Sequence, residues 1–227
     1  EGEGEGEGEG EGNNLGTLPA LPKTSGMVYV AHYHSPELKA YSIDGASPMP
    51  KGSVDMGQPA HDMALDPYND ILAVVHDTNK SLEIYELSRP ETAGGAVDLP
   101  VLISSLSFSG TPLFTKLDPI GKRVYTVVAP TAQNGDYEIH VHSLDNPANP
   151  IPVTGFPFDV APATLFEIDP ARQIFFTVGL ASDTLHIYDV QGNGGTLLGG
   201  TPVDWRNLYP QSNQKAFTTR NLTADIF

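Results

Sequence analysis

The sequence contains no cysteine and a single tryptophan. Without cysteine there are no disulfides, no thiolate catalysis and no cysteine-ligated zinc. No apolar run reaches the roughly 18 residues that a membrane-spanning helix needs, so no membrane span is expected. Basic residues are also scarce, because 12 Lys and Arg face 28 Asp and Glu for a net charge of −16. Phosphate binding requires a basic surface, and the sequence therefore predicts no nucleic-acid partner.

Residues 1–12 read EGEGEGEGEGEG and supply six of the acidic residues. Alternating charge and glycine cannot form a core, which predicts a solvated tether over residues 1–14. The tract is similar to the acidic spacers that follow the lipid-anchored cysteine of bacterial surface lipoproteins. This resemblance implies an exported protein at an extracellular, periplasmic or cell-surface location. A mature, clipped or engineered start fits the same residues.

Glycine and proline are abundant, and the sequence repeats itself. Asp-Pro pairs fall at 66, 118 and 169 in three aligned stretches: LDPYNDILAVV (65–75), LDPIGKRVYTVV (117–128) and IDPARQIFFTV (168–178). LPKTSGMVYV (21–30) occupies the same register without the pair, and LYPQSNQKAFTT (208–219) is a degraded copy. Five units are therefore visible, and self-similarity at this period is the signature of a repeat architecture.

Each unit has the same order of elements, in which the third strand is the most regular. The third strands align as LKAYSI (38–43), LEIYEL (82–87), IHVHSL (139–144) and LHIYDV (185–190). A variable stretch such as 96–104 supplies a fourth, outermost strand. Four antiparallel strands in about 50 residues make a propeller blade. The sequence predicts an all-β fold, a β-propeller over 15–227, with blades at about 15–57, 58–109, 110–157, 158–202 and an incomplete 203–227.

The stretch VYVAHYHSPELKAYSIDG (28–45), followed by GQPAHDMALDPYNDILAVVHD (57–77), resembles the YVTN-type and lactonase-type (6-phosphogluconolactonase-like) propellers. Members of this kind usually close with seven blades. The resemblance therefore implies that these five repeats belong to a longer chain, or that another chain completes the ring. A closed five-bladed ring is the alternative. These blades host enzymes and adhesins alike, so the resemblance leaves the activity open.

Histidine is the informative residue type, with seven copies. His32 and His76 end the second strands of adjacent blades at equivalent positions, and His61 with Asp62 begins a first strand. His34 and Asp77 follow in the neighbouring turns. In a propeller these segments share one face around the mouth of the central channel, so we expect a cluster of imidazoles and carboxylates there.

Such a cluster suits a divalent metal ion or an anionic or lactone substrate. His61, His32 and His76 are the candidate catalytic residues and the candidate metal ligands. Asp62, Asp77 and His34 are the candidate ligand-binding residues. The alternative is that these are surface or hydrogen-bonded loop histidines, because Val128 and Gly179 hold the position of His32 in the third and fourth copies.

Several other polar positions are interpreted as structural. His142 aligns with tyrosines 41, 85 and 188, a position that packs between blades. His140 and His186 align with Lys39 and Glu83, which predicts a position that tolerates solvent. The series Asp66, Asp118 and Asp169 is interpreted as a turn device.

Three functions remain open at this point. The first is a binding or scaffold module that recognises a protein or small-molecule ligand through loops at the channel mouth. The second is a lactonase-like hydrolase, with a histidine as general base and an acid orienting it. The third is a structural repeat in a surface assembly, in which an open blade edge pairs with the next chain.

Overall fold

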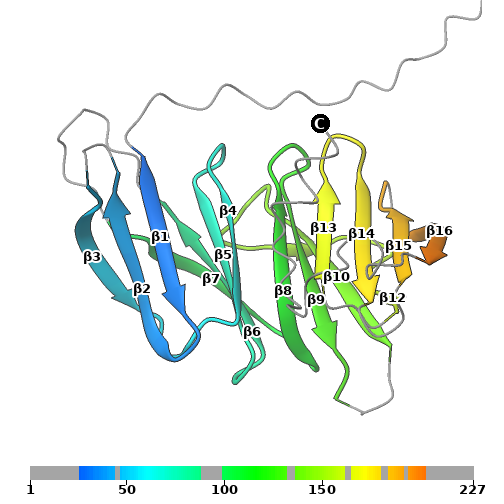
Figure 1. The fold of residues 1–227 in the computed structure, drawn as a ribbon, viewed down its shortest axis with the longest axis horizontal. Coiled ribbons are helices and arrows are strands. Elements are labelled where there is room, and N and C mark those ends of the chain that lie inside the picture. Colours follow the sequence, from blue (N-terminus) through cyan, green and yellow to red (C-terminus); the bar gives the residue numbers. More distant parts are fainter. Residues whose placement is uncertain are drawn as a thin grey trace, which may run out of the picture.

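The regular structure of the described residues consists of β-strands. The computed structural model describes residues 26–43, 47–87, 99–131, 136–161, 165–179, 184–191 and 194–202. Its strands form four antiparallel sheets that follow one another along the chain (Figure 1). The predicted tether and the predicted fifth blade lie outside these ranges. Over the same ranges, no helix is long and apolar enough to cross a membrane.

The sheets are meanders of consecutive strands. The first contains β1 (Met27–His32), β2 (Ser35–Ser42) and β3 (Met49–Asp55). The second contains β4 (Asp62–Asp66), β5 (Ile71–His76), β6 (Ser81–Glu86) and β7 (Val101–Ser107). The third contains β8 (Thr111–Asp118), β9 (Arg123–Ala129), β10 (Tyr137–Ser143), β11 (Ile151–Pro152) and β12 (Phe158–Val160). The fourth contains β13 (Leu165–Asp169), β14 (Ile174–Gly179), β15 (Thr184–Asp189) and β16 (Thr196–Pro202).

The four sheets correspond to the first four predicted repeats. The predicted third strands are β2, β6, β10 and β15, and the predicted outer strand of the second repeat is β7. The third sheet continues past residue 157, where the sequence places a blade boundary, because β12 pairs with β10. Phe158 and Val160 of β12 pack into the apolar cluster between the third and fourth sheets, which ties this segment to the third.

Each described Asp-Pro turn is held by its aspartate. The Oδ1 atom of the aspartate accepts hydrogen bonds from the backbone N–H groups two and three residues later, at 2.9–3.1 Å, in the turns that begin at Asp66, Asp118 and Asp169. The predicted turn role is thereby confirmed. The residue four positions after each aspartate has a left-handed backbone, with φ of 57° at Asp70, 48° at Lys122 and 54° at Gln173.

These turns also connect neighbouring sheets. The amide of Asn69 donates to the carbonyl oxygen of Pro119 at 3.1 Å, which joins the second and third sheets. The amide of Gln173 donates to Asp118 Oδ2 at 2.6 Å, which joins the fourth and third. A side chain that leaves one turn therefore reaches the equivalent turn of the next sheet.

The apolar core lies between sheets, in three clusters. The first is shared by the first and second sheets and includes Leu38, Leu72, Val74 and Tyr85. The second is shared by the second and third sheets, and the third by the third and fourth sheets. Alternate side chains of a central strand such as β5 enter different clusters, because successive residues of a strand point to opposite faces. This explains why β5 is buried along its whole length.

Aromatic residues at the aligned third-strand position pack between sheets as predicted. Tyr85 is buried in the cluster between the first and second sheets, and Tyr188 in the cluster between the third and fourth. His142 takes their place in β10, where it is 9% exposed and lies edge-on to Phe108 at a centroid distance of 6.3 Å. Its Nδ1 atom is buried without a hydrogen-bond partner among the described residues.

Candidate functional site

The turns after the second strands lie at the opposite end of the sheets from the Asp-Pro turns, because consecutive strands run in opposite directions. The segments that lead into the first strands lie at this same end. The backbone N–H of His61, just before β4, donates to the carbonyl of Val75 near the end of β5 at 2.8 Å. The turn after β1 and the turn after β5 thus share one end of the molecule with His61.

Side chains from these segments converge in a group that we call the Tyr33 cluster. Its members are His32, Tyr33, His34, His61, Asp77 and Phe114. The Tyr33 hydroxyl donates to Asp77 Oδ2 at 3.4 Å, and its ring meets that of His61 edge-on at 5.6 Å. His61 in turn meets Phe114 of β8 at 6.4 Å. Three sheets therefore contribute to one group of rings around a carboxylate.

Asp77 is the charged centre of the cluster, and its side chain is 31% exposed. Partial burial raises the pKa of this carboxyl, but the contacts with Thr78, His61 and Tyr33 lower it by more, so the net pKa lies below its ordinary value. The carboxylate is consequently negative at neutral pH. Its contacts are long, at 3.2 Å from Thr78, 3.4 Å from Tyr33 and 3.5 Å from His61.

The His61 ring lies against Tyr33, and the His61 side chain is 24% exposed. Its Nδ1 atom is buried and 3.5 Å from Asp77 Oδ2, which is ion-pair distance without the geometry of a hydrogen bond. An imidazole held beside a carboxylate in this way can accept a proton or donate one to a bound group. The structure thus places two of the predicted site residues, His61 and Asp77, in contact.

Asp62 follows His61 but faces the neighbouring first strand. Its Oδ2 atom accepts a hydrogen bond from the backbone N–H of Thr115 in β8 at 2.9 Å. Burial raises the pKa of this carboxyl, and hydrogen bonds together with the charge of Lys116 compensate only in part. Asp62 therefore joins the first strands of the second and third sheets.

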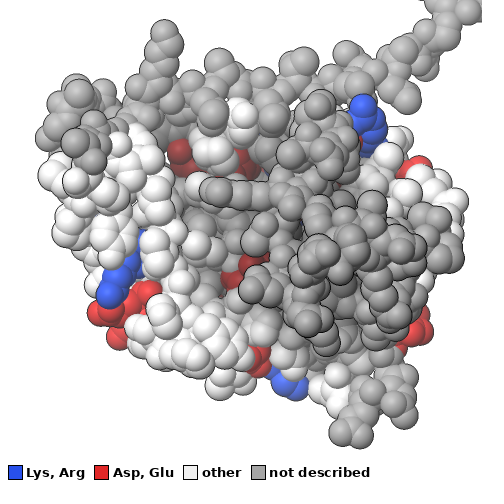
Figure 2. Space-filling view, in the orientation of Figure 1, with Lys and Arg blue, Asp and Glu red and all other residues white. Residues whose placement is uncertain are grey.

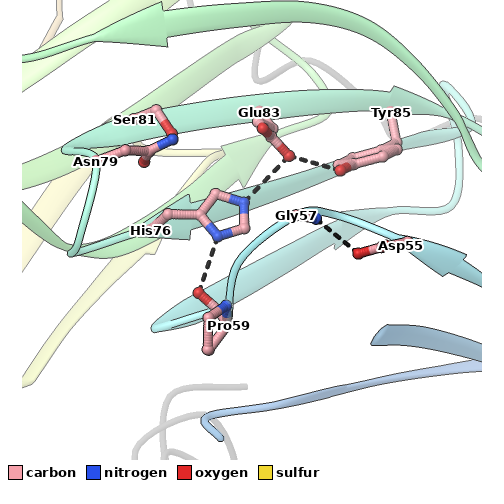
Figure 3. A network of polar contacts seen from close by, with 8 residues as sticks. All are labelled: Asp55, Gly57, Pro59, His76, Asn79, Ser81, Glu83 and Tyr85. Carbon is pink, nitrogen blue, oxygen red and sulfur yellow. Dashed lines mark hydrogen bonds and ion pairs between the residues drawn. The ribbon is translucent and has the colours of Figure 1, made fainter. Parts of the chain in front are cut away.

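His76 lies inside the molecule and is fully buried. Figure 3 shows its ring between the carbonyl of Pro59, 2.9 Å from Nδ1, and Glu83 Oε2, 3.1 Å from Nε2. The Tyr85 hydroxyl donates to the same Glu83 oxygen at 2.5 Å. The three side chains share one face of β5 and β6, because Glu83 and Tyr85 are spaced by two residues and His76 pairs with Ser81.

The partners of His76 determine its protonation. A carbonyl oxygen only accepts, so Nδ1 must carry a proton toward Pro59. Burial raises the pKa of the Glu83 carboxyl, but hydrogen bonds from His76 and Tyr85 and the charge of His76 lower it by more, so the net pKa is reduced. Glu83 Oε2 thus faces both the His76 ring and the Tyr85 hydroxyl, and His76 Nε2 lies 3.1 Å from it inside the protein.

The two equivalent histidines differ in environment. His32, at the end of β1, is exposed and its Nδ1 accepts from the backbone N–H of His34 at 3.2 Å. His76 has both ring nitrogens occupied inside the protein. The structure brings His61 and Asp77 together, adds His32 and His34 through ring contacts, and keeps His76 apart. Within the described ranges, no group of three His, Asp or Glu side chains is arranged to hold a metal ion.

The sequence analysis did not identify Tyr33, Phe114 or Glu83 as members of these networks. Tyr33 belongs to the exposed cluster, and its signal was its position between His32 and His34. Glu83 was assigned to a position that tolerates solvent, and this was wrong, since it is 8% exposed. Lys39 at the aligned position is exposed and His140 is half-buried. Glu83 is buried because His76 and Tyr85 satisfy its charge.

Comparison with known proteins shows the fold. No family model matches the sequence, and no curated protein matches it either. Similar solved structures include a proposed 6-phosphogluconolactonase from Bacteroides uniformis, with TM-score 0.61 and 11% identity over 78% of this chain and 52% of that one. The WD40 domain of Toxoplasma gondii coronin has TM-score 0.59 and 14% identity, over 83% and 45%. Saccharomyces cerevisiae Sqt1 has TM-score 0.57 and 11% identity, over 80% and 45%.

The four described sheets therefore match β-propeller structures, as the sequence predicts. The chain spans about half the length of each of these structures. At such identities the likeness concerns the fold, which hosts many unrelated activities.

Proposed function

We propose that this chain is a propeller-type binding module that recognises a protein or small-molecule partner through the Tyr33 cluster. The observation that carries the proposal is the meeting of an exposed tyrosine with a partly exposed carboxylate. Tyr33 is 52% exposed, and Asp77 beside it is 31% exposed. A tyrosine offers a large contact area at low conformational cost, and aromatic side chains are enriched where proteins bind partners.

The construction of the cluster supports this proposal. Tyr33 and Asp77 come from turns, whereas the segments that carry them are fixed by β1 and β5. Binding residues are commonly placed on loops that a rigid scaffold positions. The contact between His76 and Glu83 is buried inside the protein. It therefore stabilises the sheets that carry the cluster and is not available to a binding partner.

A random peptide library displayed on phage tests this proposal without knowledge of the natural partner. Peptides are selected on the full chain and then measured against Tyr33→Ala, Asp77→Asn and a control, Asp145→Asn. Asp145 is an exposed carboxylate after β10, at the Asp-Pro end. We expect selected peptides to lose affinity for the two cluster variants and to bind the control normally. Peptides that bind all three variants as well as the parent would refute the proposal.

A lactone hydrolase is the second candidate, and the contact between His61 and Asp77 favours it. In this reaction His61 would accept a proton from water, the water oxygen would attack the ester carbon, and the ring C–O bond would break as His61 returns the proton to the leaving oxygen. Asp77 would orient the imidazole. Hydrolysis across a panel of lactones that disappears in His61→Gln would establish this function. If no lactone in the panel turns over, the hydrolase is ruled out and the binding module stands.

The export and surface tethering that the leader predicts remain proposals. Fractionation of the source cells, followed by detection of the intact chain, would test them. Recovery of the chain from the cytoplasm alone would contradict both.

A further inference from the structure

We infer that the Tyr33 cluster receives a basic side chain, arginine or lysine, of a peptide partner. This inference rests on the proposed binding function and names the chemistry that the same site takes. The charged group would lie against the Asp77 carboxylate, and its aliphatic stem would lie along the Tyr33 ring. Three independent features of the described residues lead to it.

The first feature is the unused capacity of the Asp77 carboxylate. Its Oδ2 atom has neighbours at 3.4 and 3.5 Å, longer than the 2.5–3.0 Å of good O–H···O bonds and the 2.7–2.9 Å of charge-assisted N–H···O bonds. Glu83 shows the contrast, because one of its oxygens accepts at 2.5 and 3.1 Å. Asp77 is therefore an ionised acceptor that lacks a strong donor, whereas Glu83 is saturated.

The second feature is the aromatic surface beside that carboxylate. Tyr33 is 52% exposed, and its ring contacts His34 edge-on at 5.1 Å and His61 at 5.6 Å. These contacts hold the ring in place and leave about half of the residue open. A cation over a tyrosine face is attracted by the ring, and the stems of Lys and Arg pack on apolar surface while their charged ends stay polar.

The third feature is charge. None of the described Lys or Arg side chains forms an ion pair with Asp77, and Lys116 on the neighbouring first strand is bound by Glu167 at 3.1 Å. Figure 2 shows Asp and Glu side chains both toward the middle and along the margin of the face in view, whereas Lys and Arg lie near its margin. The net charge of −16 adds a long-range attraction for basic partners.

The test uses labelled peptides of equal length with neutral flanks and a central Arg, Lys, Gln or Glu, titrated into the full chain by fluorescence anisotropy. We expect the Arg and Lys peptides to bind roughly three- to tenfold more tightly than the Gln peptide. Asp77→Asn should remove this preference and leave the Gln peptide unaffected. Tyr33→Ala should weaken both basic peptides, whereas Tyr33→Phe, which keeps the ring, should preserve them.

Asp145→Asn is the matched control, because it removes the same charge at the other end of the sheets. If Asp145→Asn lowers the basic preference as much as Asp77→Asn does, the attraction comes from net charge and the inference is overturned. Equal binding of Gln and Arg peptides, with both lost in Tyr33→Ala, would overturn the basic ligand while the proposed binding function stands. If neither the defined peptides nor the phage-selected ones respond to the cluster variants, both fail. Equal thermal unfolding of Asp77→Asn and Asp145→Asn ensures that the comparison reports binding.

Discussion

The Tyr33 hydroxyl and Asp77 Oδ2 lie 3.4 Å apart, although the two residues hold the same turn position in adjacent blades. They are separated by 44 residues, the spacing that also relates His32 to His76. Equivalent positions of a repeat can therefore meet across a blade junction. Because these equivalent positions carry different side chains, the junction combines a tyrosine and a carboxylate that no single repeat contains.

The buried pair gives the first prediction. Glu83→Ala should lower the free energy of unfolding by about 1–3 kcal/mol, because it leaves the buried Nε2 atom of His76 and the Tyr85 hydroxyl without their partner. Glu86→Ala, on the exposed face of the same strand, should change it by less than about 0.5 kcal/mol. Urea denaturation measures both. Equal effects of the two substitutions would contradict the buried contact.

Because the folded-state pKa of Glu83 is lowered, its stabilising contribution is present above the ordinary carboxyl value and is lost as the pH falls through the folded value. The double variant His76→Leu/Glu83→Leu should recover part of the loss, since it removes both polar partners together. A double variant as unstable as Glu83→Ala would point to packing and not to the polar contact.

His142 gives the second prediction. Burial, with the charge of His140, lowers the pKa of its imidazole from the ordinary 6.5 to about 4. Between pH 6.5 and about 4, His142 is therefore protonated in the unfolded chain and neutral in the folded chain. The free energy of unfolding should consequently fall by up to about 3 kcal/mol as the pH is lowered through this range. His142→Tyr, which introduces the residue found at the aligned positions, should flatten this dependence.

Unfolding measured at pH 7 and pH 4.5 for the parent and His142→Tyr would detect the difference. His186→Gln serves as control, because it removes a half-buried imidazole from a different sheet. A parent slope that persists in His142→Tyr would show that other groups carry it.

The Asp-Pro turns give the third prediction. Replacing the turn aspartate with alanine removes two backbone hydrogen bonds and the side-chain donor to Oδ2, and it should cost about 1–3 kcal/mol at each turn. At Asp66 and Asp169 that donor lies in the same turn, whereas at Asp118 it is Gln173 of the next sheet, so only Asp118→Ala removes a bond between sheets. A double-mutant cycle of Asp118→Ala with Gln173→Ala should show coupling. Additive effects would mean that the inter-sheet bond contributes nothing.

The left-handed turn residue gives the fourth prediction. Lys122 has φ of 48°, a conformation that costs a residue with a Cβ about 1 kcal/mol or more. Lys122→Gly should therefore raise the free energy of unfolding by about 0.5–1 kcal/mol. Lys39→Gly, in the interior of β2, should lower it by a similar amount. A loss of stability in both would contradict the strain.

The fold could be predicted from the sequence because its signals are local patterns along the chain. The third strands alternate at period two, and an Asp-Pro pair begins each described turn between first and second strands. These signals depend on neighbours in the chain, so a single sequence displays them. The position of His61 before a first strand likewise followed from the repeat, and the structure places it beside Asp77.

The remaining features depend on contacts between segments far apart in the chain. The alignment of Glu83 with Lys39 and His140 predicts exposure, and the His76 ring on the adjacent strand, with the Tyr85 hydroxyl, makes its burial possible. Tyr33 enters the cluster because adjacent blades lie at a spacing that lets their turns touch. The burial of His76 and the exposure of His32 follow from different surroundings at equivalent positions, which an alignment of repeats cannot distinguish.

The placement of the core between sheets has a consequence for how such a chain can change its length. Each apolar cluster is made by two neighbouring blades, so the stabilising contacts belong to the junction between blades and not to a single blade. A duplication of one blade's length supplies one new junction, whereas a duplication of another length leaves a strand set incomplete. Array length in this architecture can therefore grow or shrink only in whole blades, and each added copy is then free to diverge at its turns.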